Sequence, residues 1–365
     1  MRADVELSAA VPLGPRTTLG VGGPARHLIE ARELDTLGEA LRWAEREGEA
    51  VAFLGGGSNL LVADEGFAGL VVGMALRGVE VERDGTDALV TAAAGEPWDE
   101  LVARTVDDGL AGLECLSGIP GSVGATPVQN VGAYGCEVSE VIARVRVLDR
   151  HDLTVRELGP ADCRFGYRDS RLKRDGAARF VVLAVTYRLR VGGAPRVRYP
   201  ELDRHLAAAG ITAPSTADVR AAVLAVRRRK SMLLDPADPN ARSCGSFFVN
   251  PVVSSEAAAA VAARCPPGSA ELPRYALPDG RVKLAAAWLI EQAGLARGTR
   301  DGHVGLSDHH TLAIVARPGA TAREVVRFAW RVRQAVHERF GITLVPEPIP
   351  WGFWRLIDGL PALDA

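Results

Sequence analysis

Hydrophobic positions along the chain follow two periods, which predict a protein built from both helices and short strands. A helical spacing of three or four residues occurs in five stretches: 35–47, 217–229, 256–264, 283–292 and 322–340. Thr321 and Glu324 form a T-x-x-E capping box ahead of the last stretch, and Gly341 suits the position just after a helix end. We therefore expect the last helix to lie between these residues.

Short apolar or alternating runs predict strands, mainly in the first half of the chain. They occupy 51–54, 70–74, 79–81, 89–92, 145–148, 154–156 and 180–185. A helix is expected to open at Pro97, because proline is favoured in the first turn of a helix. Residues 192–215 are punctuated by glycine and proline, which predicts a connection and a domain boundary near its end.

Composition narrows the class of protein. The 365 residues include 43 basic and 45 acidic side chains, so a net charge of −2 gives no pull toward nucleic acid or a membrane. The length predicts two or three domains. The chain start lacks an apolar signal core, and no run nears the ~18 apolar residues of a membrane span. Five cysteines without C-x-x-C spacing indicate reduced thiols. We expect a soluble cytoplasmic protein.

Glycine-rich runs at 54–59 and 117–125 favour close approach of the backbone to a phosphate or a flat ring system. The first is no Rossmann turn, because the third glycine of that fingerprint would fall on Leu60. The second has no lysine and is no Walker loop. The run 129–135 adds two side-chain amides, which suit the pyrimidine-like edge of a flavin. A tight turn and a structural loop remain the alternatives.

Three further runs, 167–170, 244–251 and 345–348, carry an arginine, a hydroxyl and a carboxylate. The planar fork of Arg168 matches a carboxylate, although a surface ion pair is the usual role of an arginine. Ser246 lies between a glycine and two phenylalanines, and no histidine in its run can activate it as a nucleophile. Glu347 stands between two prolines in extended backbone. Turn capping by the serine and simple solvation of the glutamate are the alternatives.

Two other groups of residues give weaker indications of function. His309 and His310 are adjacent, and neighbouring side chains in a strand point to opposite faces. No third ligand at suitable spacing is visible, so we expect no metal site. The basic run 227–230 ends a predicted helix, where it forms a solvated face or meets a ligand phosphate.

Together these runs resemble the UDP-N-acetylenolpyruvoylglucosamine reductase family, also called UDP-N-acetylmuramate dehydrogenases. The resemblance extends from 18–25 to 346–348, with the motifs in the family's order. It implies an α+β protein with a vanillyl-alcohol-oxidase-like (PCMH-type) FAD-binding domain of two subdomains and a smaller C-terminal α+β substrate-binding domain. The implied bounds are 1–75 with the tail 342–365, then 76–215, and 216–341 for the substrate domain.

The resemblance also implies the chemistry. NADPH would pass a hydride to N5 of non-covalent FAD, and the reduced flavin would return it to C3 of the enolpyruvyl ether of UDP-N-acetylglucosamine. Arg168 and a protonated Glu347 would stabilise the enolate-like species, and Ser246 would deliver a proton to C2. The product, UDP-N-acetylmuramate, serves peptidoglycan precursor synthesis in the cytoplasm. We expect a monomer whose partners are this substrate and NADPH, with no nucleic acid, membrane or metal.

Further site residues follow from the same resemblance. The cofactor-binding residues are Gly55, Gly56, Gly57, Ser58, Asn59, Gly118, Ile119, Pro120, Gly121, Ser122, Gly124, Ala125, Gln129, Asn130, Gly132, Ala133 and Tyr134. The substrate-binding residues are Tyr167, Tyr199, Lys230, Gly245 and Asn250. Tyr199 matches the substrate-closing tyrosine of the longer subtype. Cys244 departs from the family pattern and introduces an oxidisable thiol. The stretches 231–242 and 296–308 match less closely.

Two alternatives come from other classes. An FAD-dependent alcohol oxidase of the same fold class needs a base near flavin N5 and no proton donor, and neither glycine-rich run holds a histidine for covalent flavin attachment. A non-catalytic nucleotide-sugar or flavin-binding module needs no proton donor either. A preparation that stays colourless after addition of FAD would favour a nucleotide-sugar binder.

Overall fold

The computed structural model describes residues 7–175, 179–265 and 271–352, and contacts divide the chain into two compact units. Unit 1 comprises 1–11, 25–57 and 68–233, and unit 2 comprises 12–24, 58–67 and 234–365. Most of the first two predicted segments lies in unit 1 together with residues 216–233, whereas 12–24 and 58–67 lie in unit 2. The bounds of the three predicted segments stay a prediction.

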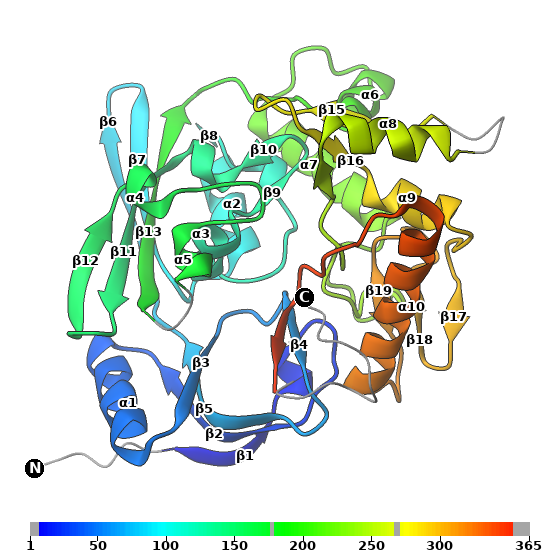
Figure 1. Ribbon diagram of the computed structural model, residues 1–365. Helices are drawn as coiled ribbons and strands as arrows, with labels where there is room; N and C mark the ends of the chain where they lie inside the picture. The colour runs from blue at the N-terminus through cyan, green and yellow to red at the C-terminus, as the bar shows by residue number, and fades with distance from the viewer. Residues whose placement is uncertain (1–6, 176–178, 266–270, 353–365) are drawn as a thin grey trace, which may run out of the picture. The chain divides into compact units, whose positions relative to one another are not determined.

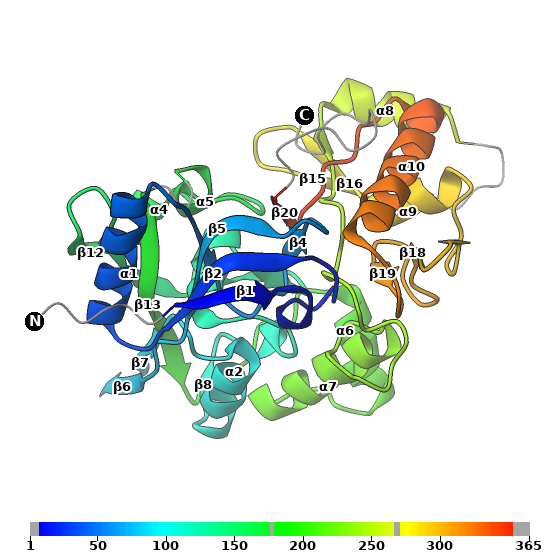
Figure 2. The ribbon, with the colours of Figure 1, turned by 90° about the horizontal axis from the view of Figure 1, so that it is seen from below.

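A small sheet with one helix forms the first part of unit 1. Its strand order is β1 (Ser8–Pro12), β2 (Pro24–Ala31), β5 (Phe67–Met74), β3 (Ala50–Leu54). Helix α1 (Leu34–Glu47) contacts β3, and Figures 1 and 2 show this helix and the strands β1, β2 and β5. Its buried face, Leu37, Ala40, Leu41 and Ala44, follows the helical period read from the sequence.

An antiparallel sheet forms the second part of unit 1. Its order is β12 (Thr154–Leu158), β11 (Ile142–Asp149), β13 (Phe180–Val191), β7 (Asp87–Ala93), β6 (Val79–Asp84), with β8 (Leu110–Ala111) also pairing with β13. Along β7 buried residues alternate with half-buried ones, as the sequence pattern predicts. Trp98 of helix α2 (Trp98–Asp107) is 1% exposed and packs against the ring of Tyr187. Pro97 is the N-cap of this helix.

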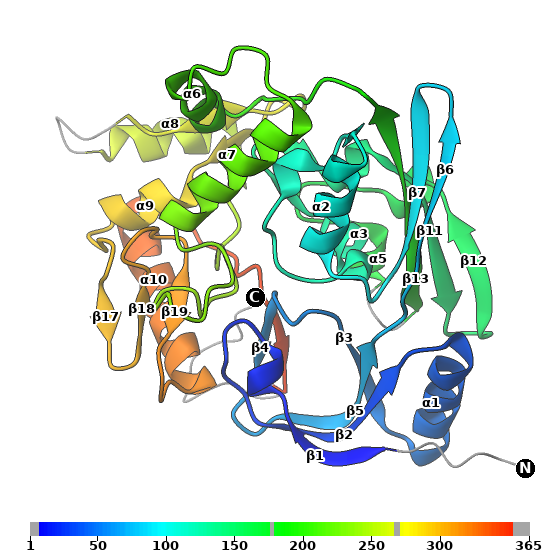
Figure 3. The same cartoon turned by 180° about the vertical axis from the view of Figure 1, so that it is seen from behind.

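Helices and short segments complete unit 1 around the residues of interest. They are η2 (Glu114–Leu116), η3 (Val123–Ala125), α3 (Thr126–Gln129), β9 (Gly132–Ala133), β10 (Cys136–Glu137), η4 (Val138–Glu140), α4 (Pro160–Cys163), α5 (Arg171–Arg174), α6 (Pro200–Ala208) and α7 (Thr216–Arg229). Helix α6 lies inside the connection predicted for 192–215. Proline starts it, and Leu202 and Leu206, four residues apart, are buried. Figure 3 shows α6 beside α7, which it contacts.

The described residues of unit 2 form short sheets, the short helix η1 and three α-helices. The strands are β4 (Leu60–Val62) paired with β20 (Ile349–Trp351), then β14 (Val252–Val253), β16 (Val282–Leu284) and β15 (Arg274–Ala276), and β17 (Arg300–Asp301), β18 (Val304–Leu306) and β19 (Ile314–Ala316). The helices are α8 (Ser255–Ala263), α9 (Ala286–Gln292) and α10 (Ala322–Phe340), after the short η1 (Gly14–Arg16). The helix predicted for 283–292 starts later, because residues 282–284 pair in β16.

Helix α10 confirms the predicted ends. The Glu324 N–H donates to Thr321 Oγ1 (3.1 Å), and the Thr321 N–H donates to Glu324 Oε2 (2.8 Å). Gly341 closes the helix at φ +72°, a conformation that glycine adopts without strain. The apolar face of α10 packs into the core of unit 2, where Phe328 and Val332 are fully buried. No helix among the described residues is long and apolar enough to span a lipid bilayer.

Candidate active site

The two glycine-rich runs lie against each other in unit 1, backbone to backbone. A Cβ on Gly55 would stand 2.4 Å from Ser122 Oγ, and one on Gly56 would stand 2.6 Å from the Cα of Gly121. A Cβ on Gly124 would meet that of Ala94 at 2.6 Å. Glycine is therefore required at these positions by internal packing. The binding of a flavin nucleotide by the backbone of these runs stays a prediction.

Gly118 is held on both sides by charged side chains that the sequence reading did not assign to the site. Its N–H donates to Asp99 Oδ1 (2.5 Å), and its carbonyl accepts from Arg227 Nε (3.1 Å). Arg220 binds both oxygens of Asp99. Burial opposes ionisation of Asp99, but the hydrogen bonds from Arg220 and Gly118 prevail and lower its pKa. These hydrogen bonds fix the position of Gly118 near the start of the second glycine-rich run.

Tyr134 and Tyr199, predicted for cofactor and substrate respectively, come together within unit 1. Their rings meet edge to face with centroids 5.5 Å apart. Burial raises the pKa of Tyr134 to about 12, although the charge of Arg227 opposes the shift. The Tyr134 hydroxyl therefore stays protonated at neutral pH, so any polar role of this group is as a hydrogen-bonding group. Residues 194–199 have no regular structure, and Tyr199 is the N-cap of α6.

Lys230 lies at the C-terminal end of α7, close to the start of α6. Its Nζ pairs with Glu201 Oε2 at 2.5 Å, and Glu201 stands in the first turn of α6. Lys230 is therefore linked through Glu201 to the first turn of the helix that Tyr199 caps. This ion pair is half-buried, so a bound phosphate would have to compete with Glu201 for the ammonium group.

Arg168 sits in a tight turn in unit 1. Gly166 and Asp169 pair across it, with N–H to carbonyl distances of 2.9 and 3.2 Å. Arg168 has φ +53°, the left-handed region that costs a non-glycine residue about 1 kcal/mol or more. Its guanidinium donates to the Gly132 carbonyl (2.7 Å) and more weakly to that of Asn130 (3.4 Å), and it lies over the ring of Tyr167. The turn is thus tied to the 130–132 backbone.

Ser246 and Glu347 belong to unit 2, on two paired extended segments. The Glu347 N–H donates to the Phe247 carbonyl (2.8 Å), the Val249 N–H donates to the Val345 carbonyl (2.9 Å), and Phe248 and Pro346 form an antiparallel bridge. This pairing places the main chain of Glu347 against Phe247, the residue that follows Ser246 in the sequence. Both residues are half-buried.

Apolar packing and one asparagine fix these segments. The rings of Phe247 and Phe248 are 0% and 1% exposed and pack together with centroids 5.2 Å apart. Asn59 Nδ2 donates to the Glu347 carbonyl (3.2 Å), and the Asn59 carbonyl accepts from the Ile349 N–H (2.9 Å). Gly245 has φ +73°, which explains a glycine before Ser246.

Cys244 is buried and donates its thiol to the Leu60 carbonyl (3.6 Å). Burial raises its pKa to about 12, and the charge of Glu347 adds to the shift. A thiol that stays protonated is a poor nucleophile, which argues against the oxidation sensitivity that the sequence suggested. All five cysteines are free thiols.

Asn250 uses its side-chain oxygen within unit 2. Oδ1 accepts from the Ala286 N–H (2.9 Å) at the first residue of α9, so it serves as a helix cap supplied from a distant residue. The contact of Asn250 with the UDP group stays a prediction. Because Oδ1 accepts from Ala286, the amide nitrogen of Asn250 would make that contact.

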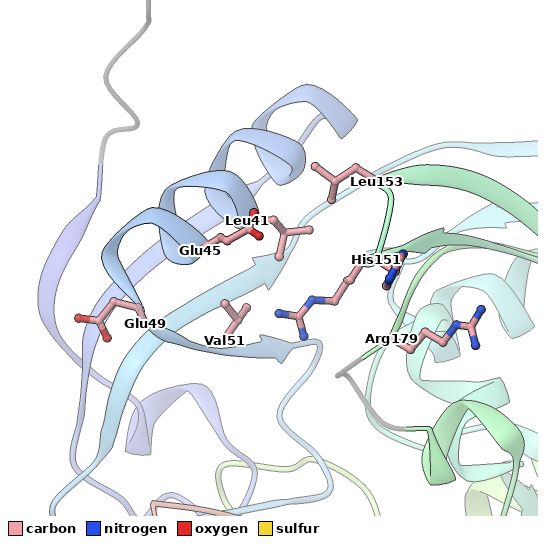
Figure 4. Close-up of a pocket in the computed structure, with 8 residues that line it drawn as sticks. Leu41, Glu45, Glu49, Val51, His151, Leu153 and Arg179 are labelled. Carbon is pink, nitrogen blue, oxygen red and sulfur yellow. The ribbon is translucent and has the colours of Figure 1, made fainter.

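A pocket of about 680 Å³ opens on unit 1, and none of the residues that line it is a predicted site residue. It is lined by Leu41, Glu45, Glu49, Val51, Arg150, His151, Leu153 and Arg179, seven of which are labelled in Figure 4. Part of its charge is already paired, because Glu49 binds Arg26 and Arg179 binds Asp149. Among the described residues, no group of three or more histidine, cysteine or acidic side chains is arranged to hold a metal ion.

Comparison with known proteins decides the family. A family pattern described as "FAD binding domain" matches residues 25–159, and one described as "UDP-N-acetylenolpyruvoylglucosamine reductase, C-terminal domain" matches residues 236–351. The reductase of Thermobifida fusca is 47% identical over 94% of this chain and 97% of its own length. That of Saccharopolyspora erythraea is 49% identical over 92% and 93%. The chain belongs to the UDP-N-acetylenolpyruvoylglucosamine reductase family.

A solved structure agrees with this assignment. The reductase of Thermus caldophilus matches with a TM-score of 0.65 and 26% identity, over 95% of this chain and 99% of its own. The predicted family, the FAD-binding fold class with its C-terminal domain, and the class of flavin oxidoreductase are therefore confirmed. The alcohol oxidase and the non-catalytic module are set aside. The individual site residues and the tyrosine subtype stay predictions.

Proposed function

We propose that Arg168, Ser246 and Glu347 carry the reduction of an enol ether in this chain. As a member of its family, the chain reduces UDP-N-acetylglucosamine enolpyruvate to UDP-N-acetylmuramate with FAD and NADPH, a step of peptidoglycan precursor synthesis. The observation that supports the residue assignment is the hydrogen bond from the Glu347 N–H to the Phe247 carbonyl, which brings the main chain of the predicted acid to the residue that follows the predicted proton donor.

When bound, FAD supplies a two-electron carrier that accepts hydride from NADPH and delivers hydride to C3 of the enol ether. Addition of hydride at C3 leaves negative charge on C2 and on the adjoining carboxylate. The guanidinium of Arg168 stabilises that charge, and the carboxyl group of Glu347 assists. Ser246 Oγ–H gives its proton to C2, which completes the saturated lactyl ether. A hydroxyl is a weak acid, but a carbanion is basic enough to take its proton.

The finer assignment to the longer subtype rests on Tyr199. Its ring meets that of Tyr134 edge to face, and it is the N-cap of α6, which Lys230 contacts through Glu201. We propose that the segment 194–199, which has no regular structure, moves so that its tyrosine closes over the substrate while Lys230 turns to a phosphate. NADPH and a UDP-linked sugar are cytoplasmic metabolites, so this step takes place in the cytoplasm, where we expect a monomer.

Anaerobic stopped-flow on the holoenzyme tests the function. NADPH should bleach the visible flavin absorbance, and the enolpyruvyl substrate should then restore it with formation of UDP-N-acetylmuramate. Failure of the substrate to reoxidise the flavin, with reoxidation by oxygen after an alcohol has reduced it, would support the oxidase. Light scattering behind gel filtration measures the oligomeric state, and a stable dimer would contradict the monomer.

A further inference from the structure

We propose that Asn130 is a positioning residue for Arg168, acting together with Glu137. The sequence assigns Asn130 to the cofactor, but its side chain is 1% exposed and its polar atoms are engaged within the protein. Both hydrogens of Nδ2 are donated, one to Glu137 Oε2 and one to the Gly166 carbonyl, each at 2.8 Å. Oδ1 accepts from the Ser139 N–H (3.2 Å). A side-chain amide has two N–H donors, so the donor capacity is used up.

These contacts lead directly to the turn that carries Arg168. Gly166, which accepts from the Asn130 amide, pairs with Asp169 and so closes the turn. The main chain of Asn130 reaches the same turn from the other side, because its carbonyl accepts from Arg168 Nη1. One buried residue therefore touches both the base of the turn and the guanidinium.

The backbone of Arg168 shows why such a tie is needed. Arg168 is held at φ +53°, a conformation that an arginine keeps only where its surroundings hold it, whereas Asn130 adopts φ +43° as the C-cap of α3. The neighbouring contacts point the same way: Ser170 Oγ donates to the Val128 carbonyl (2.7 Å), and Lys173 Nζ donates to the Arg168 carbonyl (3.0 Å). The turn is thus bound to residues 128–132 at several points.

Glu137 fixes the orientation of the Asn130 amide. A carboxylate only accepts hydrogen bonds, so Asn130 must present its nitrogen rather than its oxygen to Glu137, which also points an N–H at Gly166. Glu137 is itself held as the N-cap of η4, where it forms a capping box with Glu140. Glu137 therefore orients the Asn130 amide, the amide holds the turn at Gly166, and the turn positions the guanidinium of Arg168.

The test uses Asn130→Asp in the full-length holoenzyme, and it rests on the proposed role of Arg168. The change is nearly isosteric but places a carboxylate against Glu137 and the Gly166 carbonyl. Flavin reduction by NADPH should stay within about 2-fold, FAD affinity should be unchanged, and reoxidation by the enolpyruvyl substrate should slow about 10- to 100-fold, since small displacements of a catalytic group cost rates of this order. Anaerobic stopped-flow measures both half-reactions.

A double-variant cycle distinguishes positioning from general damage. In an Arg168→Ala background, Asn130→Asp should slow reoxidation by less than about 2-fold further, because the group that it positions is gone. Asn240→Asp is the matched control: Asn240 is also buried (3% exposed), and its Oδ1 accepts from the Asp308 N–H in unit 2. It should leave the ratio of the two half-reactions unchanged.

Each outcome decides something. Weaker FAD binding with an equal loss in both half-reactions would overturn the inference and return Asn130 to the cofactor. Wild-type reoxidation by Asn130→Asp, with slow reoxidation by Arg168→Ala, would sink the inference alone, whereas wild-type reoxidation by Arg168→Ala would sink the proposed function. If Asn130→Asp fails to fold, Glu137→Ala replaces it. This variant should slow reoxidation about 3- to 10-fold and leave flavin reduction unchanged. Equal slowing of the two half-reactions, or no slowing of either, would refute the inference.

Discussion

The Arg168 turn in unit 1 and the Ser246–Glu347 segments in unit 2 are positioned by different means. The turn has a strained backbone, and polar side chains such as Asn130 and Ser170 fasten it to the neighbouring loop. The segments of unit 2 are extended, pair through main-chain hydrogen bonds, and are backed by Phe247 and Phe248.

This difference predicts how each region responds to substitution. Main-chain pairing survives most side-chain changes, because the groups that make it are present in every residue. A turn fastened by side chains depends on those few side chains. We therefore expect the functional cost of losing a supporting residue to be larger around Arg168 than around Glu347.

The largest effect should come from Ser246→Ala. Loss of the proton donor should slow flavin reoxidation by the substrate about 10³-fold, within the range typical of general acid catalysis. Flavin reduction by NADPH should be nearly intact, because that step needs no proton at C2. Rapid-mixing measurements of the two half-reactions check this, and equal loss in both would remove Ser246 from the role of proton donor.

Arg168→Lys should have the next largest effect, with reoxidation about 10²-fold slower, the order of magnitude for loss of one charge-stabilising contact. Lysine keeps the charge but lacks the fork that reaches the Asn130 and Gly132 carbonyls together. Single-turnover rates at saturating substrate report the effect. Retention of the wild-type rate would mean that charge alone suffices and that the geometry of the turn is unimportant.

Tyr199→Phe tests the third part of the assignment. Removal of the hydroxyl should weaken binding of the enolpyruvyl substrate about 10-fold, as expected for one hydrogen bond to a charged group. The edge-to-face contact of the ring with Tyr134 should persist. Substrate dissociation constants from flavin absorbance titration measure this, with NADPH reduction as the internal control. An unchanged dissociation constant would exclude Tyr199 from the substrate site.

Asn59→Ala tests whether the position of Glu347 depends on a single supporting side chain. It removes one hydrogen bond to the Glu347 carbonyl but leaves the main-chain bonds of Glu347 and Ile349 in place. Reoxidation should slow only about 3-fold, in line with the net value of a single neutral hydrogen bond. A loss as large as that of Asn130→Asp would contradict the proposed contrast, and reduced FAD affinity would support the cofactor role predicted for Asn59.

Cys244→Ala should have the smallest effect on rate and a characteristic effect on stability. The thiol ionises at about 12 in the folded protein, above its ordinary value of 9.0, so its pKa is raised on folding. Its contribution to stability is then complete below about pH 9 and is lost as the pH rises toward 12. Urea unfolding from pH 8 to pH 10.5 should show a shallower loss of stability in the variant, and parallel curves would disprove the shift.

Much of the fold was readable from the sequence where a local pattern decides the structure. The capping box at Thr321 and the glycine at 341 set the ends of α10, and the 3.6-residue period identified the buried face of α1. Helix α6 was missed, because the surrounding glycines and prolines outweighed the two buried leucines at 202 and 206. The start of α9 was misplaced, because pairing of residues 282–284 with remote strands overrides helical spacing.

The residues of the candidate site also divide into those that a local sequence pattern identified and those that only the structure revealed. Residue order and chemistry alone identified the family, the glycine-rich runs and the candidates Arg168, Ser246 and Glu347, because each motif is a contiguous run of letters. Only the folded chain revealed that Asp99 and Arg227 grip Gly118, that Asn130 supports the Arg168 turn, and that burial keeps Cys244 protonated. Hydrogen bonds and desolvation between residues tens or hundreds of positions apart depend on three-dimensional neighbours, and no local period in the sequence encodes them.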